Sequence, residues 1–311
     1  MTGSPPRHEY ARRMHRVQAH VDRHLSEALD LTQLAAVAHF SPFHFHRLFT
    51  AWMGETVGDY LRRRRLEVAA LRLLTQPRTP VLEIALTMGF GSAEAFAHAF
   101  RARFGCSASQ WRRHKAEERA LQLRKLGQTQ SKGDQARPGA VDDDGASFNL
   151  VDPSTMHVNI NERSATRVVY LRYVGPYGPG VGAFWQQHFH PFLERHQLWG
   201  RDIYGVSHDD PEITAPASCR YDTCVEVDAS FVAPIGAQLT TIAGGTYASM
   251  PFKGTSDTIG AAWKRLMRDW LPDSGYQLDG RPTFEHYWPG ASFDLTTGAF
   301  ECNIVIPLAP L

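Results

Sequence analysis

One helical pattern occurs twice in the first 115 residues, and this duplication restricts the fold more than any other feature of the chain. The stretch LAAVAHFSPFHFHRLFTAWMG at residues 34–54 matches IALTMGFGSAEAFAHAFRARFG at residues 84–105. Each copy has a short apolar segment rich in alanine, a turn, a serine and a second amphipathic segment. Similarity at a fixed spacing indicates a repeated structural unit. We therefore expect two copies of one helix-turn-helix arrangement.

The residues at the turn of each copy support this interpretation. Ser41, followed by Pro42, and Ser92 are typical N-caps of the second helix. Gly89 suits the positive φ that such a turn requires, and His39 occupies the same place in the first copy. Histidine tolerates that backbone conformation better than most residues do.

Helical periodicity assigns the two faces of each second helix. It turns Phe45, Leu48 and Phe49 inward in the first copy, and Phe96 and Phe100 in the second. The outward residues are Phe43, His44, His46 and Arg47 in the first copy, and Ala93, Glu94, Ala97, His98 and Arg101 in the second. Arginine can bond guanine bidentately and glutamate can accept from cytosine. Two such helices would read successive major grooves about 34 Å apart.

The charge of the chain is divided unevenly. Residues 1–130 contain 20 Lys and Arg against 11 Asp and Glu, a net charge of +9, and the remainder has a net charge of −8. Residues 59–74 predict one longer helix between the copies, and its run Arg62–Arg65 is expected to contact phosphates, together with Arg112, Arg113 and Lys115. A basic half joined to an acidic half indicates a module for a polyanion linked to a module of another kind.

The basic half resembles the DNA-binding domain of the AraC/XylS family of bacterial transcription regulators. The resemblance rests on the first helix-turn-helix at 32–52, the arginine-rich linking helix, and the stretch 84–113. It implies an all-α domain with two helix-turn-helix motifs over residues 8–117, bound to double-stranded promoter DNA. It also implies base or groove-wall contacts by Phe43, His46 and Arg47 in the first helix, and by Ala93, Glu94 and His98 in the second. RNA polymerase is a further partner that such a regulator could contact.

Periodicity is lost after about residue 120. The polar stretch GQTQSKGDQARPGAVDDDGAS predicts a flexible linker over 118–155. Beyond 156, stretches such as TRVVYLRY at 166–173 and CNIVI at 302–306 are typical of strands, with helices expected at 181–196 and 258–271. VGAFW at 181–185 matches IGAAW at 259–263. The chain is thus expected to be multidomain, with the all-α part followed by an α+β domain at 156–311 of two pseudo-symmetric strand–helix–strands repeats.

The acidic half resembles the GyrI-like effector-binding domain found behind the DNA-binding domains of Rob and BmrR. The matching motifs are VGPYGP at 174–179, RPTFEHYWPG at 281–290 and IVIPL at 304–308. The resemblance implies a site of the kind used in multidrug recognition, where aromatic walls and a buried carboxylate hold an amphipathic, aromatic or cationic effector. The E-x-Y element of the family falls on Glu285 and Tyr287, which strand alternation places on one face. The predicted ligand-binding residues are Glu285, Tyr287, Tyr173, Trp185, Phe252 and Trp263.

The leading hypothesis is a one-component transcription regulator that reads promoter DNA and senses a small molecule. Two alternatives stay open: a hydrolase in which Glu285 activates water, and a ligand-free protein-interaction module. No GxSxG, Walker loop or HExxH motif is present, and neither the histidines nor the four cysteines have metal-ligand spacing, so we expect no catalytic residue, metal or cofactor. Without a signal peptide or a membrane-length apolar run, a cytoplasmic protein is expected. The operator, the effector, activation against repression, and the oligomeric state stay undetermined.

Overall fold

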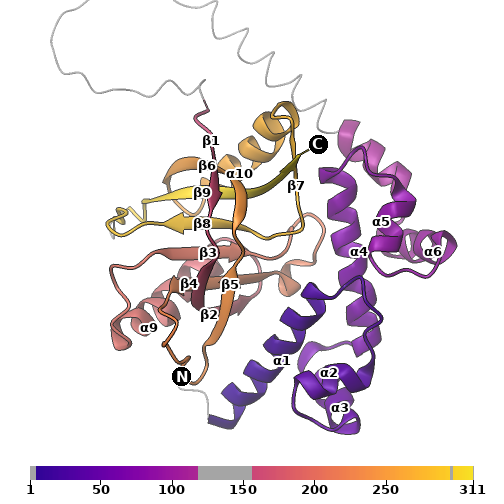
Figure 1. The fold of residues 1–311 in the computed structure, drawn as a ribbon, viewed down its shortest axis with the longest axis horizontal. Helices are drawn as coiled ribbons and strands as arrows, with labels where there is room; N and C mark the ends of the chain where they lie inside the picture. Colours follow the sequence, from indigo (N-terminus) through magenta and orange to yellow (C-terminus); the bar gives the residue numbers. More distant parts are fainter. Residues whose placement is uncertain (1–4, 118–155, 295–296, 311) are drawn as a thin grey trace, which may run out of the picture.

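The computed structural model describes residues 5–117, 156–294 and 297–310 of the 311-residue chain. A helical part lies beside a curled antiparallel sheet that carries its own helices, which confirms the predicted fold class (Figure 1). The predicted linker at 118–155 lies outside the described residues. The two parts are in contact along α1 and α4, so the chain forms one continuous body over its described ranges.

The helical part contains the duplicated unit that the sequence predicts. Its helices are α1 (Pro5–Arg23), α2 (Leu31–Val37), α3 (Pro42–Met53), α4 (Val57–Thr75), α5 (Val81–Thr87) and α6 (Ala93–Phe104), and residues 108–117 are also helical. Ser41 accepts a hydrogen bond from the backbone of His44, and Ser92 accepts one from Ala95, which confirms both predicted caps. His39 has a φ of 55° and Gly89 a φ of 72°, as the turn chemistry requires.

Each helix-turn-helix has its own apolar core, and α4 belongs to both. The first core packs Phe45 and Phe49 of α3 against Tyr60 near the start of α4. The second core packs Phe96 and Phe100 of α6 against the later part of α4, from Leu66 onward. The helix α4 therefore determines how the two reading helices, α3 and α6, lie relative to one another.

The sheet part is a nine-stranded antiparallel sheet within the described residues. Its strands are β1 (Asn159–Arg163), β2 (Thr166–Val174), β3 (Ile203–Ser207), β4 (Arg220–Glu226), β5 (Gln238–Ile242), β6 (Gly245–Gly254), β7 (Tyr276–Leu278), β8 (Thr283–Tyr287) and β9 (Phe300–Pro310). The strand order is β1-β6-β9-β8-β3-β4-β2-β5, with β7 paired to β9. The two halves, β2–β3–β4 and β6–β8–β9, are related across the β3–β8 pair, which confirms the predicted pseudo-symmetric repeat.

The connecting helix of each half covers the same face of the sheet. The first consists of α8 (Pro179–Phe184), a π-helical turn at Trp185–Phe189 and α9 (His190–Arg195), and it packs on Val169 and Val225. The second consists of α10 (Ile259–Arg265), a π-helical turn at Leu266–Trp270 and a 3₁₀ turn at Leu271–Asp273. The sequence predicted continuous helices here. The inserted residue of a π turn shifts the helix register locally, and such turns are frequent next to functional sites.

Candidate DNA-binding surface and ligand site

The first candidate reading helix, α3, presents its predicted outward residues to solvent. Phe43 is 68% exposed, and His44, His46 and Arg47 are exposed beside it, whereas Phe45 is fully buried. The guanidinium of Arg47 lies over the ring of Phe43, 5.8 Å from its centroid. This contact holds a cation and an apolar edge together at the amino-terminal half of the helix, where helices of this kind meet base edges.

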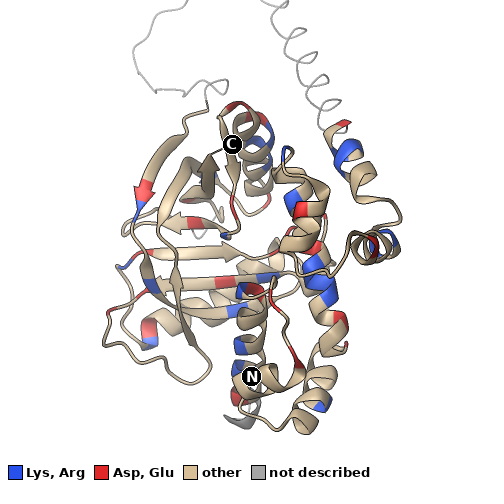
Figure 2. Ribbon diagram, turned by 45° about the vertical axis from the view of Figure 1, so that its right-hand side comes forward, with Lys and Arg blue, Asp and Glu red and all other residues tan. Residues whose placement is uncertain are grey.

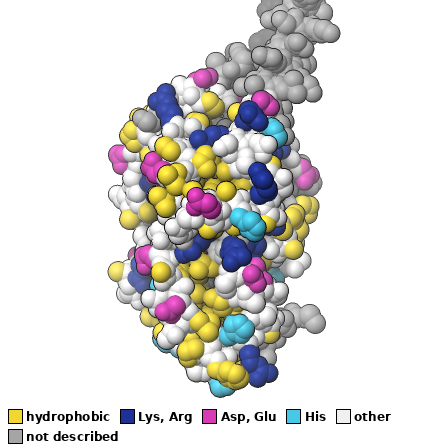
Figure 3. All heavy atoms as spheres, turned by 90° about the vertical axis from the view of Figure 1, so that its right-hand side faces the viewer, with side chains coloured by type: hydrophobic (Ala, Val, Ile, Leu, Met, Phe, Trp, Pro, Cys, Tyr) yellow, Lys and Arg dark blue, Asp and Glu magenta, His cyan; other side chains and the backbone are white. Residues whose placement is uncertain are grey.

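The second candidate reading helix, α6, shows the same division. Ala93, Glu94, His98 and Arg101 are exposed, and Phe96 and Phe100 are buried. Figure 3 shows the side of the molecule formed by the helical part, where basic and histidine side chains are dispersed among apolar ones. The two helices thus offer different outward residues on the same scaffold, and DNA contact by these residues stays a prediction.

The run Arg62–Arg65, which the sequence predicts to contact phosphates, is divided between solvent and the interior of the protein. Arg62 is exposed. Arg63 binds Glu55 at 2.6 Å, and Arg64 is buried among carboxylates. Arg65 donates to the carbonyl oxygens of residues 25, 27 and 89, so it stabilises the turns between helices. The prediction is wrong for the buried Arg64, because successive residues of one helix point in different directions. Arg63 and Arg65 are partly exposed, and phosphate contact by them stays a prediction.

The later basic residues are also divided between the surface and the interior of the fold. Arg112 donates to the carbonyl oxygens of Pro77 and Thr79, where it stabilises the turn before α5. Lys115 lies 3.9 Å from Glu212 of the sheet part. Arg113 is exposed. Arg62 and Arg113 are thus the solvent-exposed arginines of these two groups, and phosphate contact by them stays a prediction.

Glu285 occupies the centre of the sheet on its helix-covered face. It lies in β8 directly opposite Gly205 of β3, at the middle of the pair that relates the two halves. Its carboxylate accepts a hydrogen bond from the Tyr221 hydroxyl at 2.5 Å and one from Trp263 Nε1 at 3.3 Å. Only 7% of Glu285 is exposed. Both of these donors are neutral, so the buried carboxylate has no counter-charge from them.

Burial determines the electrostatics of this carboxyl group. Removal from water raises the pKa of Glu285 to about 7, while the hydrogen bonds from Tyr221 and Trp263 act in the opposite direction. Burial also raises the pKa values of Tyr221 and Tyr287 well above their usual range. A positive charge brought next to Glu285 would favour its ionised form, because it would supply the missing counter-charge.

Aromatic side chains from both halves surround Glu285. Trp185 and Trp263 are the matching tryptophans of the repeated VGAFW and IGAAW segments: Trp263 donates to Glu285, and Trp185 packs on Tyr287. The ring of Trp185 lies 5.2 Å from that of Tyr287, and the ring of Tyr287 lies 5.9 Å from that of Phe300. Tryptophan and tyrosine faces attract organic cations as well as apolar groups.

The last two predicted ligand residues lie at matching positions on the outer strands. Tyr173 of β2 is opposite Tyr221, and Phe252 of β6 is opposite Cys302, which follows the same pseudo-symmetry. The hydroxyl of Tyr173 donates to the carbonyl oxygen of Pro176 at 3.0 Å, and Phe252 packs on Phe300 at 5.6 Å. Both thus lie on strands flanking the candidate site around Glu285, and ligand contact by all six predicted residues stays a prediction.

Sequence reasoning missed Tyr221 and Gly205. Tyr221 is 4% exposed and makes the shorter of the two hydrogen bonds to Glu285. The available signal was the alternation in RYDTCVE, which puts Tyr221 and Thr223 on one face and Arg220 and Asp222 on the other. Gly205 leaves the space for this hydrogen bond, because a Cβ atom there would overlap the Tyr221 hydroxyl. Its place opposite Glu285 depends on a strand pairing that no local pattern predicts.

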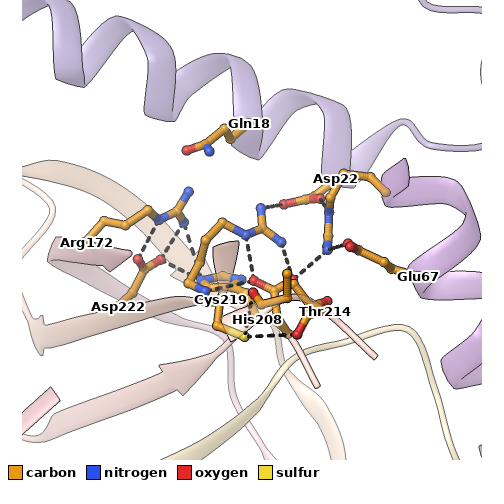
Figure 4. A network of polar contacts seen from close by, with 12 residues as sticks. Gln18, Asp22, Glu67, Arg172, His208, Thr214, Cys219 and Asp222 are labelled. Carbon is orange, nitrogen blue, oxygen red and sulfur yellow. Dashed lines mark hydrogen bonds and ion pairs between the residues drawn. The ribbon is translucent and has the colours of Figure 1, made fainter. Parts of the chain in front are cut away.

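A second cluster of polar residues lies where the helical part meets the sheet (Figure 4). Arg220 binds Asp209 through two nitrogens, at 2.8 and 2.9 Å, and also binds Asp22 of α1. Arg64 of α4 binds the same two carboxylates, Asp22 at 3.2 Å and Asp209 at 2.6 Å, and binds Glu67 at 2.7 Å. We call these five residues the interface ion cluster. Figure 2 shows basic residues of α1 and α4 gathered along this boundary.

The interface ion cluster is held in its charged state. The two guanidinium groups lower the pKa of Asp22 to about 2, and they hold the pKa of Asp209 below its usual range, although burial acts in the opposite direction on both. Arg64 is 4% exposed and Arg220 is 2% exposed. Breaking one member of a buried, paired set leaves an uncompensated charge, which is strongly destabilising.

Comparison with known proteins agrees with both parts of this architecture. Residues 34–114 match a helix-turn-helix domain family, and residues 156–309 match the family described as the GyrI-like small molecule binding domain. Regulatory protein SoxS of Escherichia coli K12 is 34% identical over 94 residues, which cover 30% of this chain and 87% of SoxS. The chain belongs to the AraC/XylS family of transcription regulators, and it carries a GyrI-like domain.

Two further proteins are similar to part of this chain. The right origin-binding protein of Escherichia coli K12 is 37% identical to this regulator over 93 residues, which cover 30% of this chain and 32% of that protein. The solved DNA-binding domain of AdpA, in complex with a target DNA, is 32% identical, with coverage of 34% of this chain and 96% of that chain and a TM-score of 0.32. Within the described residues of this DNA-binding regulator, no helix is long and apolar enough to cross a membrane. The same ranges contain no group of three or more His, Cys, Asp or Glu that could hold a metal ion.

Proposed function

We propose that this regulator controls transcription in response to an amphipathic organic cation that binds at Glu285. The observation that carries the proposal is a carboxylate that is 7% exposed, surrounded by aromatic rings and hydrogen-bonded to two neutral donors. A buried charge without a counter-charge is costly. An aromatic cation would supply both that counter-charge and the apolar surface to pack on Trp185 and Trp263.

DNA recognition in this proposal falls to the exposed residues of α3 and α6. Arg47 and His46 of α3, with Glu94 and His98 of α6, have the donors and acceptors needed to read base edges. The family membership supports a promoter as the DNA target.

Calorimetric titration with methyltriphenylphosphonium and with triphenylphosphine oxide tests the ligand site. The two compounds have nearly the same size and rings, but only the first is charged. Glu285→Gln keeps the shape of the side chain and removes its charge, so it should weaken binding of the cation by roughly 30-fold or more. Binding of the neutral oxide should change far less, because it depends on area and stacking.

Glu301→Gln is the matched control, since Glu301 also lies in the sheet but is paired with Lys253 at 2.7 Å on the surface. Its affinity for the cation should equal that of the wild type. Equal binding of the cation by wild type and Glu285→Gln would remove Glu285 from the site. Chromatography of the titrated compounds adds a further readout, since chemical conversion of a bound compound would assign the domain to the hydrolase alternative.

A further inference from the structure

The strand β4 carries residues of the ligand site on one face and of the interface ion cluster on the other. Tyr221 faces the connecting helices and donates to Glu285 at 2.5 Å. Its neighbour Arg220 faces the helical part, where it binds Asp209 and Asp22. Arg220 and Tyr221 are consecutive residues of β4 that point to opposite faces of the sheet. A displacement of the backbone at Tyr221 therefore also displaces Arg220.

The connection between β3 and β4 docks on the middle of α4. Asp209 in this connection binds Arg64 of α4 at 2.6 Å. Ile213 in the same connection is 8% exposed and belongs to the apolar core of the second helix-turn-helix, with Leu66 and Ala69. One hairpin thus holds Gly205 and Tyr221 at the ligand site and packs Asp209 and Ile213 against the DNA-binding domain.

Tyr177 adds a second link between the two faces of the hairpin. Its ring lies 6.2 Å from that of Tyr221, in an edge-to-face arrangement. Its hydroxyl donates to the carbonyl oxygen of Arg220 at 2.7 Å and lies 3.3 Å from the backbone nitrogen of Asp209. A movement of the Tyr221 ring therefore meets a side chain that is bonded to both ends of the β3–β4 connection.

The contact with α4 falls at the point between the two reading units. Tyr60 belongs to the core under α3 and Leu66 to the core under α6, and Arg64 lies between them. Asp22, the other partner of Arg220, lies on α1, which contributes residues to the first core. A shift of Arg220 and Asp209 therefore acts where the angle between α3 and α6 is determined.

We propose that the β3–β4 hairpin, residues 203–226, couples occupancy of the Glu285 site to the relative placement of the two reading helices. This inference rests on the proposed function for the identity of the ligand. A cation that binds Glu285 either displaces the Tyr221 hydroxyl from the carboxylate or brings Tyr221 and Glu285 closer together. Tyr221 moves in both cases. The hairpin then passes the movement to Asp22 and Arg64, because buried ion pairs tolerate little separation and packed interiors transmit strain.

The interface has room for such a movement. A cleft of about 260 Å³ lies between the two domains and is lined by Gln18, Tyr60 and Arg64 on one side and by Val174, Ser218 and Arg220 on the other. Gln18 Oε1 and the Tyr60 hydroxyl border this cleft and have no hydrogen-bond partner among the described residues. Arg220, which is paired with Asp22 and Asp209, borders this space directly.

The experiment measures DNA affinity of the full chain by fluorescence anisotropy, on a duplex selected from a random library, with and without saturating methyltriphenylphosphonium. For the wild type we expect the cation to change the dissociation constant for DNA by about fivefold or more. Asp209→Asn and Ile213→Ala should each reduce that change to less than about twofold. Their affinity for the cation in the absence of DNA should stay within about twofold of the wild type, since neither residue touches Glu285.

Glu212→Gln is the control, because Glu212 lies in the same connection but its ion pairs with Lys115, Lys264 and Arg268 are long, at 3.9, 3.8 and 3.5 Å. It should keep the wild-type response. A full response in both Asp209→Asn and Ile213→Ala would overturn the coupling role of the hairpin.

A double-mutant cycle without ligand separates this inference from the proposed function. Glu285→Gln should change DNA affinity in the wild-type background by about threefold and have no effect in the Asp209→Asn background. That result supports the coupling even if the cation does not bind. If the effects of the two substitutions on the dissociation constant for DNA multiply to within about twofold, the two sites are not coupled. The inference would then fail, although the proposed binding of the cation could still be correct.

Discussion

Gly205 lies directly opposite Glu285 in the pairing of β3 with β8, and it is the residue that lets Tyr221 reach the carboxylate. A Cβ atom at position 205 would overlap both the Tyr221 hydroxyl and the carboxylate oxygen that it binds. The two matching positions of the pseudo-symmetric halves thus carry a glutamate in one half and a glycine, which has no side chain, in the other. The space left by the glycine holds the hydrogen bond at the centre of the site.

Gly205→Ala should therefore separate Tyr221 from Glu285. We expect a loss of stability of about 1–3 kcal/mol, because a methyl group is forced into a filled space, and a loss of cation affinity of tenfold or more. Urea denaturation and calorimetric titration measure the two effects. Gly260→Ala is the control, since a Cβ there meets nothing within 4 Å. An unchanged affinity in Gly205→Ala would show that the bond between Tyr221 and Glu285 is not needed for binding.

Cation affinity should depend on pH through Glu285. With a pKa of about 7, its carboxyl group is mostly protonated at pH 6 and mostly ionised at pH 8, so affinity for methyltriphenylphosphonium should rise roughly tenfold over this interval. The neighbouring Tyr221, Tyr287 and Cys302 stay protonated throughout, because burial raises the pKa of each. Titrations at the two pH values check this. The same rise in Glu285→Gln would assign it to another group.

Folding stability should respond to the same group with the opposite sign. The folded-state pKa of Glu285 is raised from 4.5 to about 7, so the folded protein binds more protons than the unfolded chain between these values. The contribution of this carboxyl group to the free energy of unfolding is therefore fully present below about pH 4.5 and is lost as the pH rises to 7. The loss amounts to at most about 3 kcal/mol. Glu285→Gln should gain stability relative to the wild type between pH 5 and pH 8 in urea denaturation. A constant difference across this range contradicts the raised pKa.

Arg47→Ala should remove a base contact from the first reading helix. We expect a cost of about 1–3 kcal/mol in specific binding and a weaker preference at one base position, because Arg47 is exposed and forms no ion pair within the described part of the chain. Arg62→Ala should instead weaken binding to all sequences alike and reduce the salt dependence. Anisotropy titrations at several salt concentrations on selected and random duplexes measure both. Equal losses on the two duplexes for both variants would contradict this division of roles.

Arg65→Ala should act on stability rather than on DNA. Its three hydrogen bonds to backbone carbonyl oxygens join the turns before α2 and after α5 to α4. Loss of these bonds should lower the free energy of unfolding by about 1–3 kcal/mol. The salt dependence of DNA binding by the folded protein should match that of the wild type. A reduced salt slope would mean that Arg65 contacts phosphate after all.

The sequence by itself determined the local features of this protein. Ser41 and Ser92 as caps, positive φ at His39 and Gly89, and the buried faces of α3 and α6 all depend on residues within a few positions of one another. Alternation along β8 likewise placed Glu285 and Tyr287 together, and the repeated VGAFW and IGAAW segments pointed to the matching tryptophans. Helical and strand periodicities are short-range properties, so a single sequence displays them directly.

The tertiary structure alone decided which partners those residues meet. Arg64 binds a carboxylate 145 positions away, and Arg220 binds one 198 positions away, so no local pattern distinguishes these arginines from the exposed Arg62. Tyr221 and Gly205 join Glu285 only through the pairing of β4, β3 and β8. The link from the ligand site to the reading helices depends on these long-range contacts, because it is the packing of one domain on the other that creates them.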